Sequence, residues 1–147
     1  MCLISHNLIV MNEKNSLTDS IIIENRIFNI RGMQVMIDRD LAELYRVETK
    51  VLNQSVKRNI ERFPSLFRFQ LSDIELAELV TICDRFVKLK HSSSFPYAFT
   101  EQGVAMLSAV LKSETAIKVS IQIMQTFFEM RKFISNNAFI FQRLDKL

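Results

Sequence analysis

The feature that most constrains this chain is its shortage of residues that make tight turns. Only two glycines and two prolines occur among 147 residues, where average usage, roughly 12%, would give about 18. Because tight turns and glycine-rich phosphate loops depend on these residues, repeated hairpins are not expected. Hydrophobic residues make up 48% of the chain, and this length suffices for a single domain with a real core.

The first predicted elements are two strands and a short helix. Residues 21–37 are rich in Ile and Val, show no helical stripe and are interrupted by Asn25 and by Arg31-Gly32, so they predict a strand, a turn and a strand. Asp38 then offers a side-chain oxygen as the N-cap of a helix. Apolar residues follow at helical spacing, and they are Leu41, Ala42, Leu44 and Tyr45.

A second helix follows after a tight turn. Glu48 or Thr49 caps its start, and Pro64 ends it near Phe63 because proline disfavours the helical conformation in the residue before it. Its apolar residues recur on one face and are expected to point inward, namely Leu52, Val56, Ile60 and Phe63. Arg46 occupies the turn position where a left-handed conformation, and hence glycine, is favoured. This pattern is typical of a helix-turn-helix.

The second half of the chain alternates short strands with helices. Residues 67–71 predict a strand, after which Ser72 or Asp73 starts a short helix through Val80. Residues 96–99 predict a further strand, and Thr100 caps a helix that runs toward Leu111. Ser113 caps a last helix that has no Gly or Pro through residue 147. The predicted fold class is α+β, with a small antiparallel sheet, several helices including the helix-turn-helix-like pair, and a long carboxy-terminal helix.

The outer face of the second predicted helix carries the side-chain types that read DNA. Asn and Gln can pair with adenine in the major groove, while Arg and Lys serve guanine edges or phosphates. The candidate DNA-binding residues are Lys50, Asn53, Gln54, Lys57, Arg58 and Arg62. Positive charge is local here, since residues 48–70 hold five bases and two acids whereas residues 71–84 hold four acids and no base. An ordinary solvated helix face is the alternative interpretation of these residues.

Four stretches, taken in order, resemble one family. They are IRGMQVMIDRDLAELY, ETKVLNQSVKRNIERFP, FRFQL and PYAFTEQGVAML. Together they closely resemble the phage "open reading frame six" amino-terminal domain, a DNA-binding module related to KilA-N and found in phage antirepressors and prophage genes. The similarity covers residues 21–134. It departs from the family pattern at Arg46, where Gly is common, at Ser120, where Asn is common, and at Gln125, where Arg is common.

This resemblance implies a phage or prophage-type transcriptional regulator or antirepressor that binds double-stranded DNA sequence-specifically. A phage repressor protein is a further implied partner. The alternative function is a protein–protein interaction module that acts without direct DNA contact. No enzyme activity and no cofactor are expected, because His6 and His91 lack a sequence-local acid or nucleophile.

The cysteines and the hydropathy bear on location. Cys2 and Cys83 lie 81 positions apart without CxxC spacing, which argues against a zinc fold. No window approaches the roughly 18 to 20 apolar residues of a membrane span, and residues 1–10 lack the features of a signal peptide. We therefore expect a reducing, cytoplasmic setting without a membrane partner. The family resemblance implies that this is the cytoplasm of a bacterial host, with association at the nucleoid.

The last predicted helix carries a heptad seam. Its apolar positions alternate at steps of four and three, and its members are Ile123, Phe127, Met130, Ile134, Asn137, Phe141 and Leu144. Packing of this helix on its own domain explains the seam up to Ile134 equally well. Beyond that point a homodimer is expected, with Ile134, Asn137, Phe141 and Leu144 as the dimerisation residues.

The predicted organisation has three parts. They are a mobile leader at residues 1–20, for which an over-called start is an alternative explanation, the DNA-binding domain at residues 21–134, and the start of a coiled-coil or dimerisation helix at residues 135–147.

Overall fold

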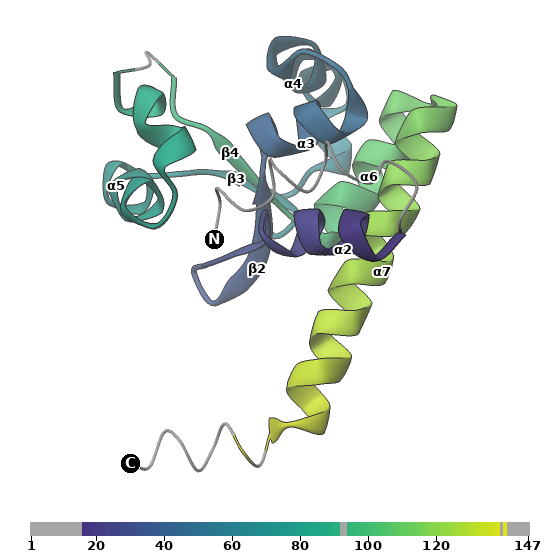
Figure 1. Cartoon of the computed structure of the whole chain (residues 1–147). Helices are drawn as coiled ribbons and strands as arrows, with labels where there is room; N and C mark the ends of the chain where they lie inside the picture. The colour runs from purple at the N-terminus through teal and green to yellow at the C-terminus, as the bar shows by residue number, and fades with distance from the viewer. Residues whose placement is uncertain (1–15, 92–93, 139, 141–147) are drawn as a thin grey trace.

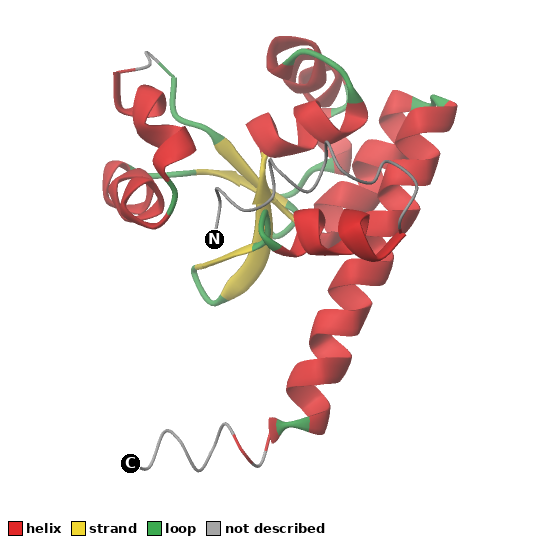
Figure 2. Ribbon diagram, viewed as in Figure 1, coloured by secondary structure: helices red, strands yellow, loops and turns green. Residues whose placement is uncertain are grey.

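The computed structural model describes residues 16–91, 94–138 and 140, and in this part of the chain four antiparallel strands form one sheet. Their order across the sheet is β1-β2-β4-β3. The strands are β1 (Phe28–Ile30), β2 (Met33–Ile37), β3 (Arg68–Gln70) and β4 (Tyr97–Thr100). Figure 2 shows the sheet in the middle of the molecule, with helices on both sides of it. The predicted α+β class is therefore confirmed.

Helices cover the two sides of the sheet unequally (Figure 1). One side carries α2 (Ser16–Glu24), α3 (Asp38–Tyr45), α4 (Thr49–Arg58), α6 (Glu101–Leu111) and α7 (Glu114–Asn136). The other side carries α5 (Asp73–Ile82) and the 3-10 helix η2 (Asp84–His91). A single 3-10 turn, η1 (Ile60–Arg62), follows α4. The two helices proposed for DNA binding thus share one side with the long final helix.

The sheet has a separate hydrophobic core on each of its two faces. Met36 and Phe99 lie in the core beneath α3, α4, α6 and α7. Val35, Ile37 and Ala98 lie in the second core, beneath α5 and η2. Because successive side chains of a strand point to opposite faces, β2 and β4 are buried on both sides. The sheet therefore contributes side chains to both cores.

The hairpin between β1 and β2 forms as predicted. Arg31 and Gly32 both have positive φ, 57° and 73°, and Ile30 pairs with Met33 across them. Two central residues with positive φ match a type I′ turn, whose twist suits a two-residue hairpin.

The segment before β1 differs from its prediction. Residues 21–24, predicted as strand, belong to α2, and the strand prediction is wrong there. Ile22 and Ile23 are buried, and α2 lies against α7. Contact with a distant helix overrides the strand preference of β-branched residues. Helix α2 begins at Ser16, inside the segment predicted as the leader, residues 1–20.

Helix α4 ends one turn earlier than predicted. It stops at Arg58, because Asn59 leaves helical geometry and donates its side-chain N–H to the Ser55 carbonyl. The chain continues in η1, which turns Ile60 outward to 52% exposure, so its predicted inward position is wrong. Phe63 is buried as predicted and stacks edge-on against Phe99.

Side-chain caps start three later helices as predicted. Ser72 forms a capping box with Glu75 at the start of α5. Thr100 accepts from the Gly103 N–H at the start of α6, and Ser113 accepts from the Ala116 N–H at the start of α7. The described part of α7 ends at Asn136, whereas the prediction ran to residue 147. Helix η2, whose Phe86 is fully buried, was not predicted.

Candidate nucleic-acid interface

The turn between α3 and α4 is a left-handed helix end. Arg46 has φ 60° and ψ 42°. Its N–H bonds to the Glu43 carbonyl, and the Val47 N–H donates to the Ala42 carbonyl at 3.0 Å, which together make a Schellman motif. The predicted left-handed position is therefore confirmed. An arginine there costs roughly 1 to 2 kcal/mol relative to glycine.

Helix α4 buries one face and exposes the other. Leu52 and Val56 are fully buried in the core. The exposed candidates are Lys50, Gln54, Lys57, Arg58 and, in η1, Arg62. Within the part of the chain that the structure describes, none of these bases forms an ion pair. Their positive charge is therefore unneutralised on the surface, where an anionic partner can reach it.

Asn53 does not join this exposed group. It is half-buried, and its Nδ2 donates to Asp38 Oδ2 at 3.0 Å. Its Oδ1 is buried and has no hydrogen-bond partner in the described structure. The prediction that Asn53 faces outward is therefore wrong, because its amide joins the start of α3 to the middle of α4.

Asp38 is the centre of this joint rather than a helix cap. The N-cap position of α3 is Ile37, and Asp38 is the first residue of the helix, so the N-cap prediction is wrong. Asp38 accepts from the Asn53 amide, from the Tyr97 N–H at 3.2 Å and from the Arg39 N–H. Burial raises the pKa of Asp38, while these hydrogen bonds and the charge of Arg68 oppose the rise. One carboxylate thus connects α3, α4 and β4.

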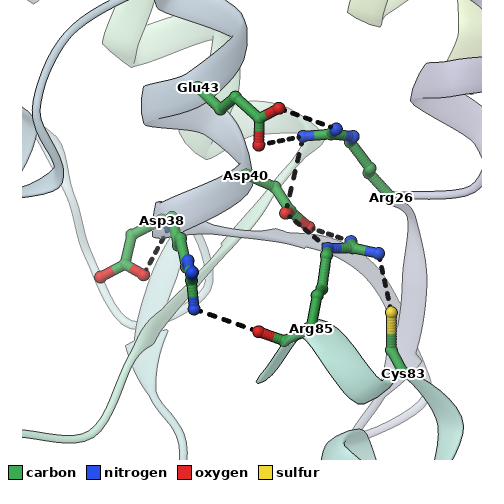
Figure 3. Close-up of polar contacts among 7 residues, drawn as sticks. Arg26, Asp38, Asp40, Glu43, Cys83 and Arg85 are labelled. Carbon is green, nitrogen blue, oxygen red and sulfur yellow. Dashed lines mark hydrogen bonds and ion pairs between the residues drawn. The ribbon is translucent and has the colours of Figure 1, made fainter. Parts of the chain in front are cut away.

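Asp40 lies between two arginines that come from distant parts of the chain (Figure 3). Arg85 approaches it bidentately, with Nη2 2.6 Å from Oδ2 and Nε 3.1 Å from Oδ1. Arg26 lies 3.7 Å away and also bonds bidentately to Glu43. Asp40 is only 1% exposed, and burial raises its pKa although Arg85 and Arg26 lower it. Asp40 lies in the first turn of α3, where a carboxylate is favourable, but two arginines rather than solvent surround it.

Sequence reasoning missed this network. Arg26 precedes β1, and Arg85 lies in η2, 45 positions after Asp40. No local pattern pairs residues so far apart. Arg39 adds a further link, since its Nη1 donates to the Arg85 carbonyl at 3.1 Å. The network fixes the start of α3 against both α2 and η2.

Two departures from the family pattern have different surroundings. Ser120 on α7 is buried, and its hydroxyl lies 2.8 Å from that of Tyr45 at the end of α3. Burial raises the pKa of Tyr45 to about 12. Gln125 is exposed on α7. Ser120 therefore joins α3 to α7. The surroundings of Gln125 do not explain the departure at that position.

The predicted dimerisation residues are only partly described. Ile123 and Phe127, the first seam residues, are buried in the domain's own core. Ile134 is 47% exposed, and Asn137 follows the helix end and donates its side-chain N–H to the Phe133 carbonyl. Phe141 and Leu144 lie outside the described residues. The homodimer through this segment stays a prediction.

The described part of the chain offers neither a metal-binding cluster nor a helix that could span a membrane. Across residues 16–91, 94–138 and 140, no group of three or more His, Cys, Asp or Glu side chains is placed to hold a metal ion. No helix in the same ranges has both the length and the apolar composition that crossing a bilayer requires.

These elements define a small α+β domain that presents a basic helix from a rigid joint. A family model, the ORF6N domain, matches residues 25–110. The chain therefore belongs to the ORF6N family, and its resemblance to the phage "open reading frame six" amino-terminal domain is confirmed. The match begins just before β1 and ends at the last turn of α6, so it contains the whole sheet and both α3 and α4. No curated protein and no solved structure matched the chain.

Proposed function

We propose that this protein binds double-stranded DNA through the exposed face of α4 and acts as a phage-type transcriptional regulator or antirepressor. The observation that carries the proposal is the set of unneutralised bases on a helix whose other face is anchored in the core, in a chain of the ORF6N family. A helix of this diameter fits the major groove. No residue has a catalytic role in this function. The protein acts in the bacterial cytoplasm, at the nucleoid.

The bases and the amides have different roles in this proposal. Lys50, Lys57, Arg58 and Arg62 contact phosphates or guanine edges. Gln54, which is exposed, is the amide available for reading a base. Asn53 is a positioning residue instead, because its Nδ2 is engaged by Asp38. Specificity from α4 therefore rests on fewer side chains than the sequence predicted.

Charge separation supports the orientation of the domain on DNA. Helix α5, on the far side of the sheet, carries the exposed acids Asp73 and Glu78 and no base. Helix α4 carries three exposed bases and no acid. Long-range attraction to phosphate therefore favours an approach with α4 in front.

The salt dependence of binding tests the phosphate contacts. The slope of log K against log salt is negative, and each neutralised phosphate makes it steeper by about 0.9. If Lys57 and Arg58 each neutralise one phosphate, replacing both with Ala makes the slope less steep by about 1.8. The matched control replaces Lys88 and Lys90 with Ala, since these exposed bases lie on η2 and carry the same charge. An unchanged slope in the α4 variant, or an equal change in both variants, would remove these residues from the interface.

Base reading by Gln54 is tested on selected sites. Sites are first isolated from a random duplex pool, and Gln54→Ala is then measured on the preferred site and on random DNA. We expect a loss of about 1 to 3 kcal/mol on the preferred site and little on random DNA. Equal losses on both would show that Gln54 only positions the backbone.

A protein–protein interaction module is the second candidate. The observation that favours it is the pair Ile74 and Ile82, which are 72% and 68% exposed on the acidic α5. A partner protein, such as the phage repressor implied by the resemblance, would cover this apolar surface. Absence of DNA binding at low salt would favour this function over the first.

A further inference from the structure

The outer side of α7 carries an apolar stripe that the described chain leaves exposed. Ile117, Ile121 and Phe128 are 48%, 54% and 54% exposed. Their spacings of four and seven residues place them on one helical face. Ile123 and Phe127, which are buried, lie on the opposite face. The stripe is therefore separate from the heptad seam that faces the core.

Charged side chains accompany this stripe in a fixed order. Lys118 and Glu129 lie along one flank, near its first and last members, and both are exposed. Glu114 and Lys132 extend the same order by one turn at each end. Within the described residues none of these four forms an ion pair. Along the helix these four charges therefore run negative, positive, negative, positive. On either side of a point midway between Ile121 and Phe128, each Lys has a Glu as its counterpart.

We propose that this outer face of α7 is an interface with a second copy of the chain, in which the two α7 helices pack antiparallel. Ile121 of one copy then lies opposite Phe128 of the other. In that register Lys118 falls within two residues, about 3 Å along the axis, of the level of the other copy's Glu129. Glu114 likewise comes within about one turn of the other copy's Lys132.

The positions of these charges favour a second copy of the chain as the partner and an antiparallel arrangement of the two α7 helices. A two-fold axis repeats each Lys–Glu contact, so four pairs form from one self-complementary surface. In a parallel pair the two-fold axis runs along the helices, so the flank that carries Lys118 and Glu129 in one copy meets the other flank of its partner, and these Lys–Glu contacts do not form. Figure 1 shows α7 along one edge of the molecule, away from the sheet. The bodies of the two copies therefore lie on opposite sides of the helix pair.

Zero-length carbodiimide cross-linking of the full chain tests the register directly. Lys118 and Glu129 are eleven residues apart on one helix, roughly 16 Å, so a bond between their side chains has to join two copies. We mix isotopically labelled and unlabelled protein and expect a mixed-mass peptide that joins Lys118 to Glu129. A chain that dimerises without this cross-link, or a chain that stays monomeric at several hundred micromolar, overturns the proposal.

Sedimentation of charge-reversal variants tests the same contacts in solution. We expect Lys118→Glu and Glu129→Lys each to raise the dimer Kd at least tenfold at low salt, and the double reversal to restore it. Ile121→Ser with Phe128→Ser should also raise Kd at least tenfold. Ile74→Ser is the matched control, because Ile74 is equally exposed but lies on α5, and circular dichroism verifies each fold. Loss of the dimer through Ile134→Ser alone, with the Ile121 and Phe128 variant unaffected, assigns dimerisation to the seam and overturns the proposal.

Discussion

The two sides of the sheet hold their charged residues in different ways. On the α3–α4 side, Asp38 and Asp40 are buried and bind groups from distant segments. On the α5 side, Glu75 bonds to Arg31, which is 45% exposed, and to its own helix start at Ser72. Surface ion pairs contribute little to stability, whereas a broken buried pair is costly. The basic helix α4 is thus presented by the side whose polar contacts are hardest to disrupt.

The largest expected effect comes from removing the charge of Asp40. Asp40→Asn leaves Arg85 without its bidentate partner and Arg26 with Glu43 alone, so unfolding free energy should fall by about 3 kcal/mol. Urea denaturation measures it. Glu43→Gln is the control on the same arginine, because Glu43 is 54% exposed, and its loss should stay within about 1 kcal/mol.

A double variant makes this prediction sharper. If the cost comes from an uncompensated buried charge, Arg85→Met combined with Asp40→Asn should be less destabilising than the sum of the single losses. Additive losses would mean that Asp40 and Arg85 act independently. The Asp40–Arg85 pair would then not be the reason why the polar contacts on the α3–α4 side are hard to disrupt.

A smaller effect is expected at the turn between α3 and α4. Arg46→Gly should raise stability by up to about 1 kcal/mol, because φ is 60° and glycine accepts this conformation freely. Thermal unfolding should then shift upward by about 3 to 5 °C. Gln54→Gly is the control, since Gln54 is exposed inside the helix α4, and it should destabilise instead. A lower melting temperature for Arg46→Gly would show that the arginine side chain has a stabilising contact.

Local chemistry explains which parts of this molecule the sequence could predict. The caps at Ser72, Thr100 and Ser113, the Arg31 turn and the left-handed Arg46 depend on residues a few positions apart, and all were predictable. Helix α2 was missed because its burial against α7 is a long-range contact. The roles given to Asp38 and Asn53 failed for the same reason. Asp38 was predicted as a cap and Asn53 as an outward-facing amide, but Asp38 binds Asn53 and the Tyr97 N–H, which lie far away in the sequence.

The smallest expected effect is the response of Glu75 to acid. The Arg31 hydrogen bond lowers the pKa of Glu75 from 4.5 to about 2. The stability from this pair is therefore fully present above pH 4.5 and lost as pH falls toward 2. Urea unfolding of Glu75→Gln, which keeps a capping side chain, should differ from the unmodified chain at pH 6 and converge with it near pH 2. Glu78→Gln, an exposed neighbour on α5, is the control, and a Glu75→Gln difference that stays constant with pH would show that the Arg31 pair contributes nothing.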